Sequence, residues 1–99
     1  MKSTVVRYRT KADRADENQR LVEAVFEDLR AHAPQGFDYQ VQRLDDGVSF
    51  VHVVVEHDVA GSDSLQDVPA FQKFVADIAD RCEDPPAASG ASVVGRYFG

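Results

Sequence analysis

The hydrophobic and polar positions along the chain form short alternating segments and longer segments with helical spacing. Residues 4–10 alternate two sets of side chains and are rich in β-branched and aromatic residues, which predicts a first strand. Apolar side chains then recur with a period of about 3.6 residues, with charged side chains between them. This spacing predicts a helix over about 14–33, ended by Pro34 and Gly36.

The centre of the chain predicts a β-hairpin. Residues 37–44 alternate apolar and polar side chains, which is the period of a half-buried strand. Asp45, Asp46 and Gly47 follow, and an Asp-Gly pair is favoured in tight hairpins because it tolerates positive φ. The next strand is predicted from residue 48 to about residue 57.

This third segment is apolar on both of its faces. The side chains of one face include Val48, Phe50 and Val54, and those of the other are Val51, Val53 and Val55. A strand with two apolar faces needs cover on both sides of its sheet. Because one layer of two helices covers only one side, the pattern predicts that a second subunit covers the other.

The C-terminal part predicts a second helix and a final strand. Apolar side chains again recur with helical spacing, which predicts a helix over 64–82 with charged side chains, Arg81 among them, on its solvated face. A loop containing proline and glycine follows over 85–90. Residues 91–98 are then predicted as the last strand.

The predicted order, βαββαβ, belongs to the α+β class and is the ferredoxin-like split βαβ arrangement. Right-handed crossovers place both helices on one face of a four-stranded antiparallel sheet. The composition, with 43% hydrophobic and 28% charged residues, is typical of a globular protein. We therefore expect one domain over residues 1–99.

Charge and composition exclude several classes of partner. A formal net charge of −6 and a pI near 4.8 oppose binding to nucleic acid. The sequence has neither the apolar run of about 20 residues that a spanning helix requires nor a charged start leading into an apolar run, so we expect no membrane segment and a cytoplasmic location. The single cysteine, Cys82, cannot form an internal disulfide and is expected to be a small core residue.

The sequence contains no motif for a cofactor or a metal. Its six glycines are scattered and form neither a Walker loop nor a dinucleotide fingerprint. His52 and His57 are five residues apart on one predicted strand, so they point to opposite faces and cannot chelate one ion. We therefore expect no cofactor and no metal site built by the protein.

His52 is the main candidate for chemistry. It shares a face with Phe50 and Val54, so a neutral imidazole with a matched partner would act as a general base or as a hydrogen-bond donor to a substrate. The alternative is a structural histidine in the core or at a subunit interface. A two-residue turn would set His52 across from Val41, whereas a three-residue turn would shift the pairing and favour a structural hydrogen-bond network.

Aromatic and basic side chains on the strands offer ligand contacts. Tyrosine side chains would line a pocket for an aromatic ligand and orient it through their hydroxyls, or would only pack. Arginines on the two terminal strands would clamp an anionic substrate or join salt bridges across a dimer. The tyrosines are Tyr8, Tyr39 and Tyr97, and the arginines are Arg7, Arg9 and Arg96.

One familiar nucleic-acid motif is only partly matched. Residues 47–53 share a glycine, one aromatic residue and a valine with the third-strand motif of RNA-recognition modules. Asp46 stands at the basic position of that motif, and two of its three stacking positions are not aromatic. We therefore reject RNA binding.

The chain resembles the antibiotic biosynthesis monooxygenase-like group of dimeric α+β barrels in three segments. These are 5–11 (VVRYRTK), 50–56 (FVHVVVE) and 65–74 (LQDVPAFQKF), the last leading towards Pro85 and Pro86. The resemblance implies two sheets packed face to face, with a ligand cavity between the sheet and the helices of each subunit. It also implies the chemistry of some members, which are cofactor-independent oxygenases that convert phenolic polyketides to quinones; related members degrade haem, and many have no known activity.

Two residues common in the oxidising members have no counterpart here. The chain contains no tryptophan, and Glu56 stands near the place where those members carry one at the end of strand three. Arg7 is the nearest match to their asparagine on strand one. Neither role is therefore transferred to this chain.

These observations predict a homodimer that binds a small, aromatic molecule and oxygenates a phenolic or polyketide-like substrate with electrons from the substrate and O₂. His52 is the candidate catalytic base, and the candidate substrate-binding residues are Arg7, Tyr8, Tyr39 and Phe50. The alternative is a ligand-binding or assembly module of the same fold without turnover. An apolar pocket with His52 hydrogen-bonded elsewhere would favour that alternative.

Overall fold

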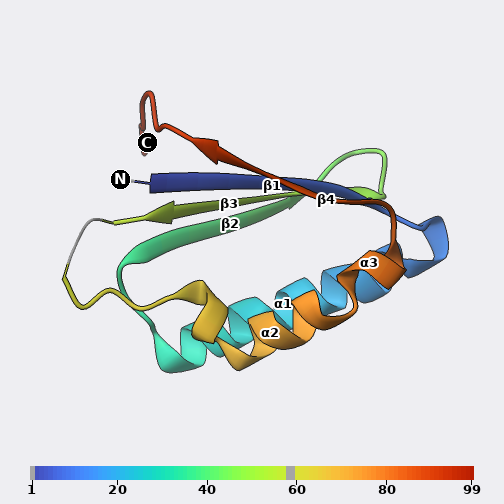
Figure 1. Cartoon of the computed structure of the whole chain (residues 1–99), viewed down its shortest axis with the longest axis horizontal. Coiled ribbons are helices and arrows are strands. Elements are labelled where there is room, and N and C mark those ends of the chain that lie inside the picture. Colours follow the sequence, from blue (N-terminus) through green and yellow to red (C-terminus); the bar gives the residue numbers. More distant parts are fainter. Residues whose placement is uncertain (1, 58–59) are drawn as a thin grey trace.

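The computed structural model describes residues 2–57 and 60–99. Four antiparallel strands form one sheet in the order β2-β3-β1-β4, and all helices lie on one of its faces (Figure 1). This confirms the predicted α+β architecture. The elements are β1 (Lys2–Thr10), η1 (Ala12–Arg14), α1 (Ala15–His32), β2 (Phe37–Arg43), β3 (Ser49–Glu56), η2 (Leu65–Asp67), α2 (Pro69–Ala76), α3 (Ile78–Arg81) and β4 (Cys82–Ala91).

The first helix ends at a residue in the left-handed backbone conformation. Ala33 adopts the left-handed conformation, with φ 45° and ψ 52°, and its N–H donates to the carbonyl of Leu29 at 2.7 Å. Pro34 follows and cannot continue the helix. The observed helix, Ala15–His32, therefore lies within the range that the sequence predicts.

The β2–β3 hairpin has the register that places His52 across from Val41. Its turn is closed by Asp46, whose carboxylate accepts hydrogen bonds from the backbone N–H groups of Val48 and Ser49 at 2.9 and 2.8 Å. Gly47 takes a positive φ of 78°, as the Asp-Gly pair predicts. His52 consequently points to the helix-covered face, together with Phe50 and Val54.

The predicted second helix over 64–82 is wrong as one continuous helix. Asp77, with φ −121° and ψ 24°, separates α2 from α3, and the 3₁₀ turn η2 precedes α2. Arg81, predicted on the solvated face, lies in the interior and is only 1% exposed, at the helical spacing of seven residues from the buried Phe74.

The last strand lies earlier than predicted, at Cys82–Ala91 and not at residues 91–98. Pro85 and Pro86 interrupt neither the strand nor the sheet, because β4 is an edge strand, where a missing N–H is tolerated. The pairing register with β1 shifts where they lie, between the partners of Arg7 and Arg9. Arg96 and Tyr97 thus follow β4 and do not belong to it.

Strand β3 carries apolar side chains on both faces of the sheet, whereas its neighbours β1 and β2 add polar side chains such as Arg7 and Gln40 to the outer face. The core lies between the sheet and the helices; its buried members include Tyr8, Val22, Val25, Phe50, Leu65 and Phe74. On the other face, Val51, Val53 and Val55 of β3 are only partly buried. No helix covers this face in the described part of the chain (Figure 1).

None of the helices in residues 2–57 and 60–99 is long and apolar enough to cross a membrane.

Candidate ligand-binding site

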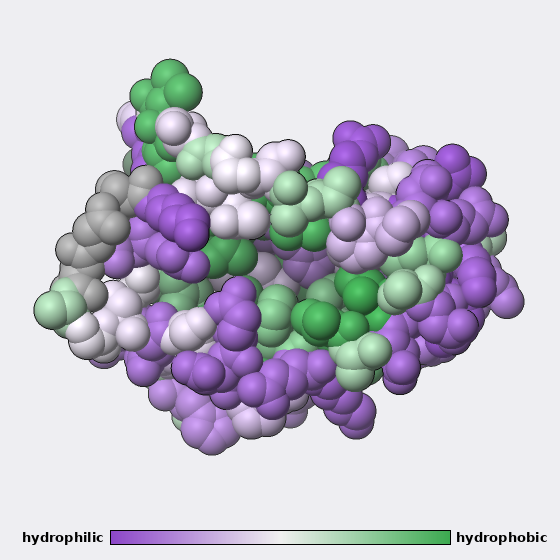
Figure 2. Space-filling model, in the orientation of Figure 1, coloured by the Kyte–Doolittle hydropathy of each residue, from purple (hydrophilic) through white to green (hydrophobic). Residues whose placement is uncertain are grey.

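A cavity of about 310 Å³ lies between the sheet and α2. Figure 2 shows a hollow between the edge of the sheet and the helix layer, with hydrophobic residues on its walls. Phe71, Phe74, Val75 and Ile78 line it from the helix side, and β4 contributes Pro86 and Ala88. Its size is within the range of small-molecule sites, roughly 300–1,000 Å³.

Besides Thr4, Glu56 and Gln66, the polar lining of this cavity contains a chain of hydrogen bonds across three adjacent strands. The hydroxyl of Tyr39 is 2.7 Å from Nδ1 of His52, and Nε2 of His52 is 2.7 Å from the hydroxyl of Tyr8. All three side chains line the cavity. The sequence reasoning nominated these three residues, and the fold brings them together.

The strand register explains why these three side chains meet. Tyr8 pairs with Phe50, and Tyr39 pairs with Val54, so each tyrosine is a diagonal neighbour of His52 on the same face. Diagonal neighbours lie about 7–8 Å apart at the backbone, a span that aromatic side chains bridge. The hydrogen-bonded chain therefore follows from the antiparallel register.

Two further buried side chains extend this chain into the helix layer. The Asn18 side chain of α1, which is fully buried, donates from Nδ2 to the hydroxyl of Tyr8 at 2.8 Å. Arg81 donates from Nε to Oδ1 of Asn18 at 3.1 Å and from Nη2 to the carbonyl of Phe74 at 2.6 Å. The result is one continuous chain of five side chains, Arg81–Asn18–Tyr8–His52–Tyr39.

Sequence reasoning missed Asn18 and Arg81. Asn18 was detectable, because it lies three residues after Ala15 and four before Val22, in phase with the buried positions of α1. Arg81 was detectable in the same way, because it lies seven residues after Phe74 and three after Ile78, in phase with the buried side of that helical segment.

Burial controls the protonation of this chain. It lowers the pKa of His52 to about 4, so the imidazole is neutral at pH 7. Burial also raises the pKa of Tyr8, partly offset by the hydrogen bond from Asn18. The pKa of Tyr39 is raised by burial as well. The Tyr8–His52–Tyr39 part of the hydrogen-bond chain is therefore built from neutral hydroxyl and imidazole groups.

Aromatic packing holds the chain in place. His52 stacks on Phe74, with ring centroids 5.2 Å apart, and Tyr39 stacks on Phe26 at 5.1 Å. Tyr8 stacks on Phe50, with centroids 5.5 Å apart and planes inclined by 11°. These contacts restrict the rotamers that place each polar atom.

The other nominated residues lie away from this cavity. Phe50 is 1% exposed and contacts Tyr8 in the core, without lining the cavity. Arg7 is exposed and lines a different hollow beside Arg9. Tyr97 is 91% exposed, and Arg96, also after β4, donates to Asp38 at 2.8 Å. Of these residues, only Phe50 contacts the Tyr39–His52–Tyr8 group, through its stacking on Tyr8.

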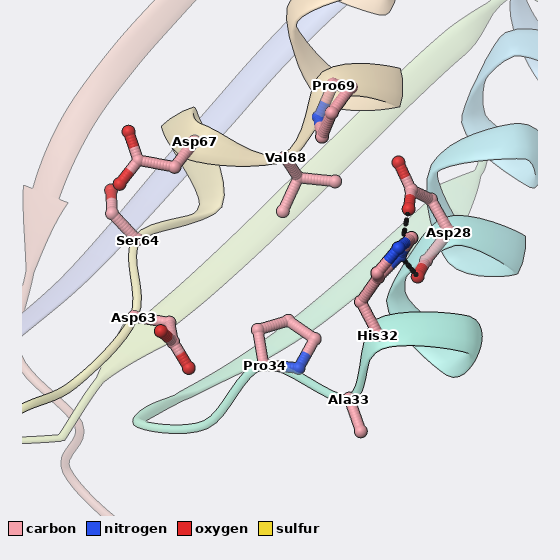
Figure 3. Close-up of a pocket in the computed structure, with 9 residues that line it drawn as sticks. All are labelled: Asp28, His32, Ala33, Pro34, Asp63, Ser64, Asp67, Val68 and Pro69. Atoms are coloured by element: carbon pink, nitrogen blue, oxygen red, sulfur yellow. Dashed lines mark hydrogen bonds and ion pairs between the residues drawn. The ribbon is translucent and has the colours of Figure 1, made fainter.

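A second hollow, of about 380 Å³, lies between the end of α1 and the start of α2 (Figure 3). Three of its charged side chains, Asp28, His32 and Asp63, already have structural partners. Asp28 pairs with His32 at 2.6 Å and accepts a hydrogen bond from the N–H of Ala70 in the first turn of α2. Asp63 accepts from the N–H of Gln35. This hollow offers few unengaged groups for ligand chemistry.

No group of three or more histidine, cysteine or acidic side chains with metal-binding geometry occurs within residues 2–57 and 60–99. Cys82 is buried as a free thiol, and burial raises its pKa. It therefore behaves as the small core residue that the sequence predicts.

Comparison with solved structures identifies proteins of the same fold. The chain superposes on Rv0793 from Mycobacterium tuberculosis with a TM-score of 0.75 and 16% identity, covering 98% of each chain. A protein described as an antibiotic biosynthesis monooxygenase matches with a TM-score of 0.75 and 17% identity, over 96% of this chain and 100% of that one. SnoaB, a cofactor-independent oxygenase from Streptomyces nogalater, matches with a TM-score of 0.68 and 13% identity, over 96% and 94%.

These matches confirm the fold that the sequence resemblance implies, that of the antibiotic biosynthesis monooxygenase-like proteins. At identities of 13–17% the likeness is one of fold. No protein-family model matches the chain, and no curated protein sequence matches it. Function must therefore be argued from the site.

Proposed function

We propose that the protein binds a small, flat aromatic molecule in the cavity between its sheet and α2. The observation that carries this proposal is the combination of aromatic and aliphatic walls with the buried Tyr39–His52–Tyr8 chain, while Thr4, Glu56 and Gln66 complete the polar lining. Small-molecule sites commonly combine apolar enclosure with a few placed polar atoms. The shared fold with SnoaB, which is described as a cofactor-independent oxygenase, supports a role in small-molecule binding.

Filling the mouth of the cavity should abolish binding. Val75 lies on α2, lines the cavity and is 44% exposed, so a larger side chain is accommodated there without disturbing the core. We expect Val75→Trp to weaken binding of 1-naphthol by at least about tenfold, because the probe loses its contact with α2. The affinity is measured by NMR titration.

The matched control is Lys73→Trp, an exposed position on the same helix that does not line the cavity. It should leave the affinity for 1-naphthol unchanged. Equal affinities of Val75→Trp and the unmodified protein would place any binding elsewhere and contradict the proposal.

Oxygenation without a cofactor is the second candidate, favoured by the hydroxyl of Tyr39 in the cavity wall. A hydroxyl that donates to a phenolate oxygen stabilises the electron-rich anion that reduces O₂. With 1-naphthol, one O₂ would give 1,4-naphthoquinone and water, one oxygen atom going to each product. Because both ring nitrogens of His52 are engaged by tyrosines, His52 orients the Tyr39 hydroxyl in this scheme, and the proton of the phenol passes to solvent.

Measuring O₂ uptake with the same probe, 1-naphthol, separates binding alone from oxygenation. O₂ uptake that equals quinone formation, and that is lost in Tyr39→Phe, would support turnover. Binding of 1-naphthol without O₂ uptake would leave a ligand-binding module without catalysis.

We further infer that the functional unit is a homodimer, with a second copy on the outer face of the sheet. Val51, Val53 and Val55 lie on that face, and the segment after β4 projects from the same side (Figure 1). In that segment Val94 and Phe98 are 100% and 80% exposed. Apolar groups gathered in this way commonly mark an interface.

Sedimentation at micromolar concentration should therefore give the mass of a dimer. Each uncovered valine would otherwise forfeit up to about 1.5 kcal/mol of burial. Val53→Lys should shift the equilibrium towards monomer or unfolded chain, whereas Lys73→Glu on the exposed face of α2 should not. A folded monomer as the main species at this concentration would contradict the inference. If folding and association are coupled, stability should also rise with protein concentration.

A further inference from the structure

The direction of the buried hydrogen-bond chain can be deduced from its first member. An arginine side chain has only donors, so the atom of Asn18 that faces Arg81 must be its amide oxygen. The amide nitrogen of Asn18 then necessarily faces Tyr8, to which it donates. Arg81 thereby fixes the orientation of Asn18, and Asn18 fixes Tyr8 as an acceptor.

The same reasoning continues through Tyr8 to His52. The Tyr8 hydroxyl is buried, and its partners in the described part of the chain are Asn18 and His52. Since it accepts from Asn18, its own proton is satisfied only by donation to Nε2 of His52. The proton of the neutral imidazole must then reside on Nδ1, which donates to the hydroxyl of Tyr39.

The hydroxyl proton of Tyr39 is the one proton of the hydrogen-bond chain that has not yet been assigned an acceptor. Among residues 2–57 and 60–99 its hydroxyl bonds to His52 alone, and it accepts that bond. The Tyr39 side chain lines the cavity. Its O–H group is therefore the donor end of a chain that begins at a buried guanidinium and ends at the cavity.

We propose that Asn18, through the direction it imposes on this chain, makes the cavity select ligands that present a hydrogen-bond acceptor, such as a carbonyl or phenolate oxygen, to Tyr39. The inference rests on the proposed function, because it assigns the ligand chemistry of that same cavity. Asn18 acts as a specificity-determining residue without touching the ligand.

The substitution Asn18→Asp should reverse the direction of hydrogen-bond donation along the buried chain of side chains. A carboxylate accepts from Arg81 and also from the hydroxyl of Tyr8, which then accepts from Nε2 of His52. The imidazole proton moves to Nε2, Nδ1 accepts from Tyr39, and the lone pairs of Tyr39 become available to the cavity. The variant replaces one NH₂ group of one side chain by an oxygen atom and keeps its shape.

The direction of hydrogen-bond donation can be measured without any ligand. Long-range ¹H–¹⁵N NMR distinguishes a protonated from an unprotonated ring nitrogen. In the unmodified protein we expect His52 to carry its proton on Nδ1, and in Asn18→Asp on Nε2. A proton on Nε2 in the unmodified protein would overturn the inference and leave the proposed function intact.

Ligand selection is tested with three bicyclic probes of similar shape. 1-Indanone offers only an acceptor, indole only an N–H donor, and indene neither. The unmodified protein should bind 1-indanone about three- to tenfold more tightly than indene, the worth of one neutral hydrogen bond, and should show no such gain for indole. In Asn18→Asp the preference should pass to indole.

The ratio of the affinity for 1-indanone to the affinity for indole measures selection by the hydrogen bond. A general change in the cavity affects both probes and leaves this ratio unchanged. A folded Asn18→Asp that still prefers 1-indanone would overturn the inference. If this variant does not fold, Tyr39→Phe decides instead: it should bind 1-indanone and indene equally, and a persisting preference for 1-indanone would overturn it. Failure of all three probes to bind would overturn the proposed function together with this inference.

Discussion

Replacing Phe50 by alanine should lower the free energy of unfolding by about 3–5 kcal/mol, as is typical when a buried phenylalanine is truncated. Phe50 is 1% exposed, stacks on Tyr8 at 5.5 Å, and carries the guanidinium of Arg43 over its ring at 5.6 Å. The change removes a ring from the closed part of the core. Denaturant unfolding at fixed protein concentration measures the loss.

Phe71→Ala is the matched comparison for this prediction. Phe71 is only partly buried and lines the cavity, so its truncation should cost less stability, about 1–2 kcal/mol, and should weaken ligand binding more. The sequence nominated Phe50 for substrate binding. If Phe50→Ala kept near-native stability while losing 1-naphthol binding, that original role would be correct and the core role wrong.

The part of the site that lies on the strands was predictable because strand geometry is regular. The Asp-Gly turn implied the pairing of Val41 with His52, and the period of two then put Tyr39 and Phe50 on the same face. The hydroxyls of the two tyrosines meet the ring of His52 as a consequence of that register. Sequence reasoning named all three residues and did not foresee that they bond to one another.

The helix and edge elements were harder to predict for local reasons. A pair of prolines such as Pro85 and Pro86 is typical of a loop. Only the position of β4 at the edge of the sheet makes the pair compatible with a strand. The break at Asp77 involves neither glycine nor proline, so no pattern announces it. Arg81 was missed for a different reason: a charged side chain favours a solvated position, although its spacing of seven residues from Phe74 places it on the buried side.

The two residues that sequence reasoning missed matter for function because both belong to the buried hydrogen-bond chain. Tyr8, His52 and Tyr39 alone are consistent with either direction of hydrogen bonding. Arg81 and Asn18, which sequence reasoning missed, remove that ambiguity. His52 accordingly is the centre of a directed chain, with neither ring nitrogen free to contact a substrate.

Acidification should destabilise the protein through His52. Burial lowers the pKa of His52 to about 4 in the folded chain, against an ordinary value near 6.5 in the unfolded chain. Between these values the unfolded chain binds a proton that the folded chain refuses, so stability rises with pH. The contribution is present in full above about pH 6.5 and is lost as pH falls to about 4, a loss of about 3 kcal/mol.

Other groups act outside this window or with the opposite sign. The pKa of Asp46 is lowered to about 2 by its hydrogen bonds to Ser49 and Val48, so its contribution is lost only at lower pH. The pKa of His32 is raised by its bonds to Asp28. His32 therefore stabilises the folded chain below its ordinary pKa, and that contribution fades as pH rises through the raised value.

The experiment compares the pH dependence of unfolding in His52→Leu and His32→Gln, each at one protein concentration. Because the loss of hydrogen bonds to Tyr8 and Tyr39 lowers the stability of His52→Leu at every pH, the slope is the relevant quantity. His52→Leu should lose most of the rise in stability between pH 4 and pH 6.5, whereas His32→Gln should keep it or show a steeper one. An unchanged slope in His52→Leu would mean that His52 is protonated as readily in the folded chain as in the unfolded chain, and the neutral, directed chain at the cavity would then be wrong.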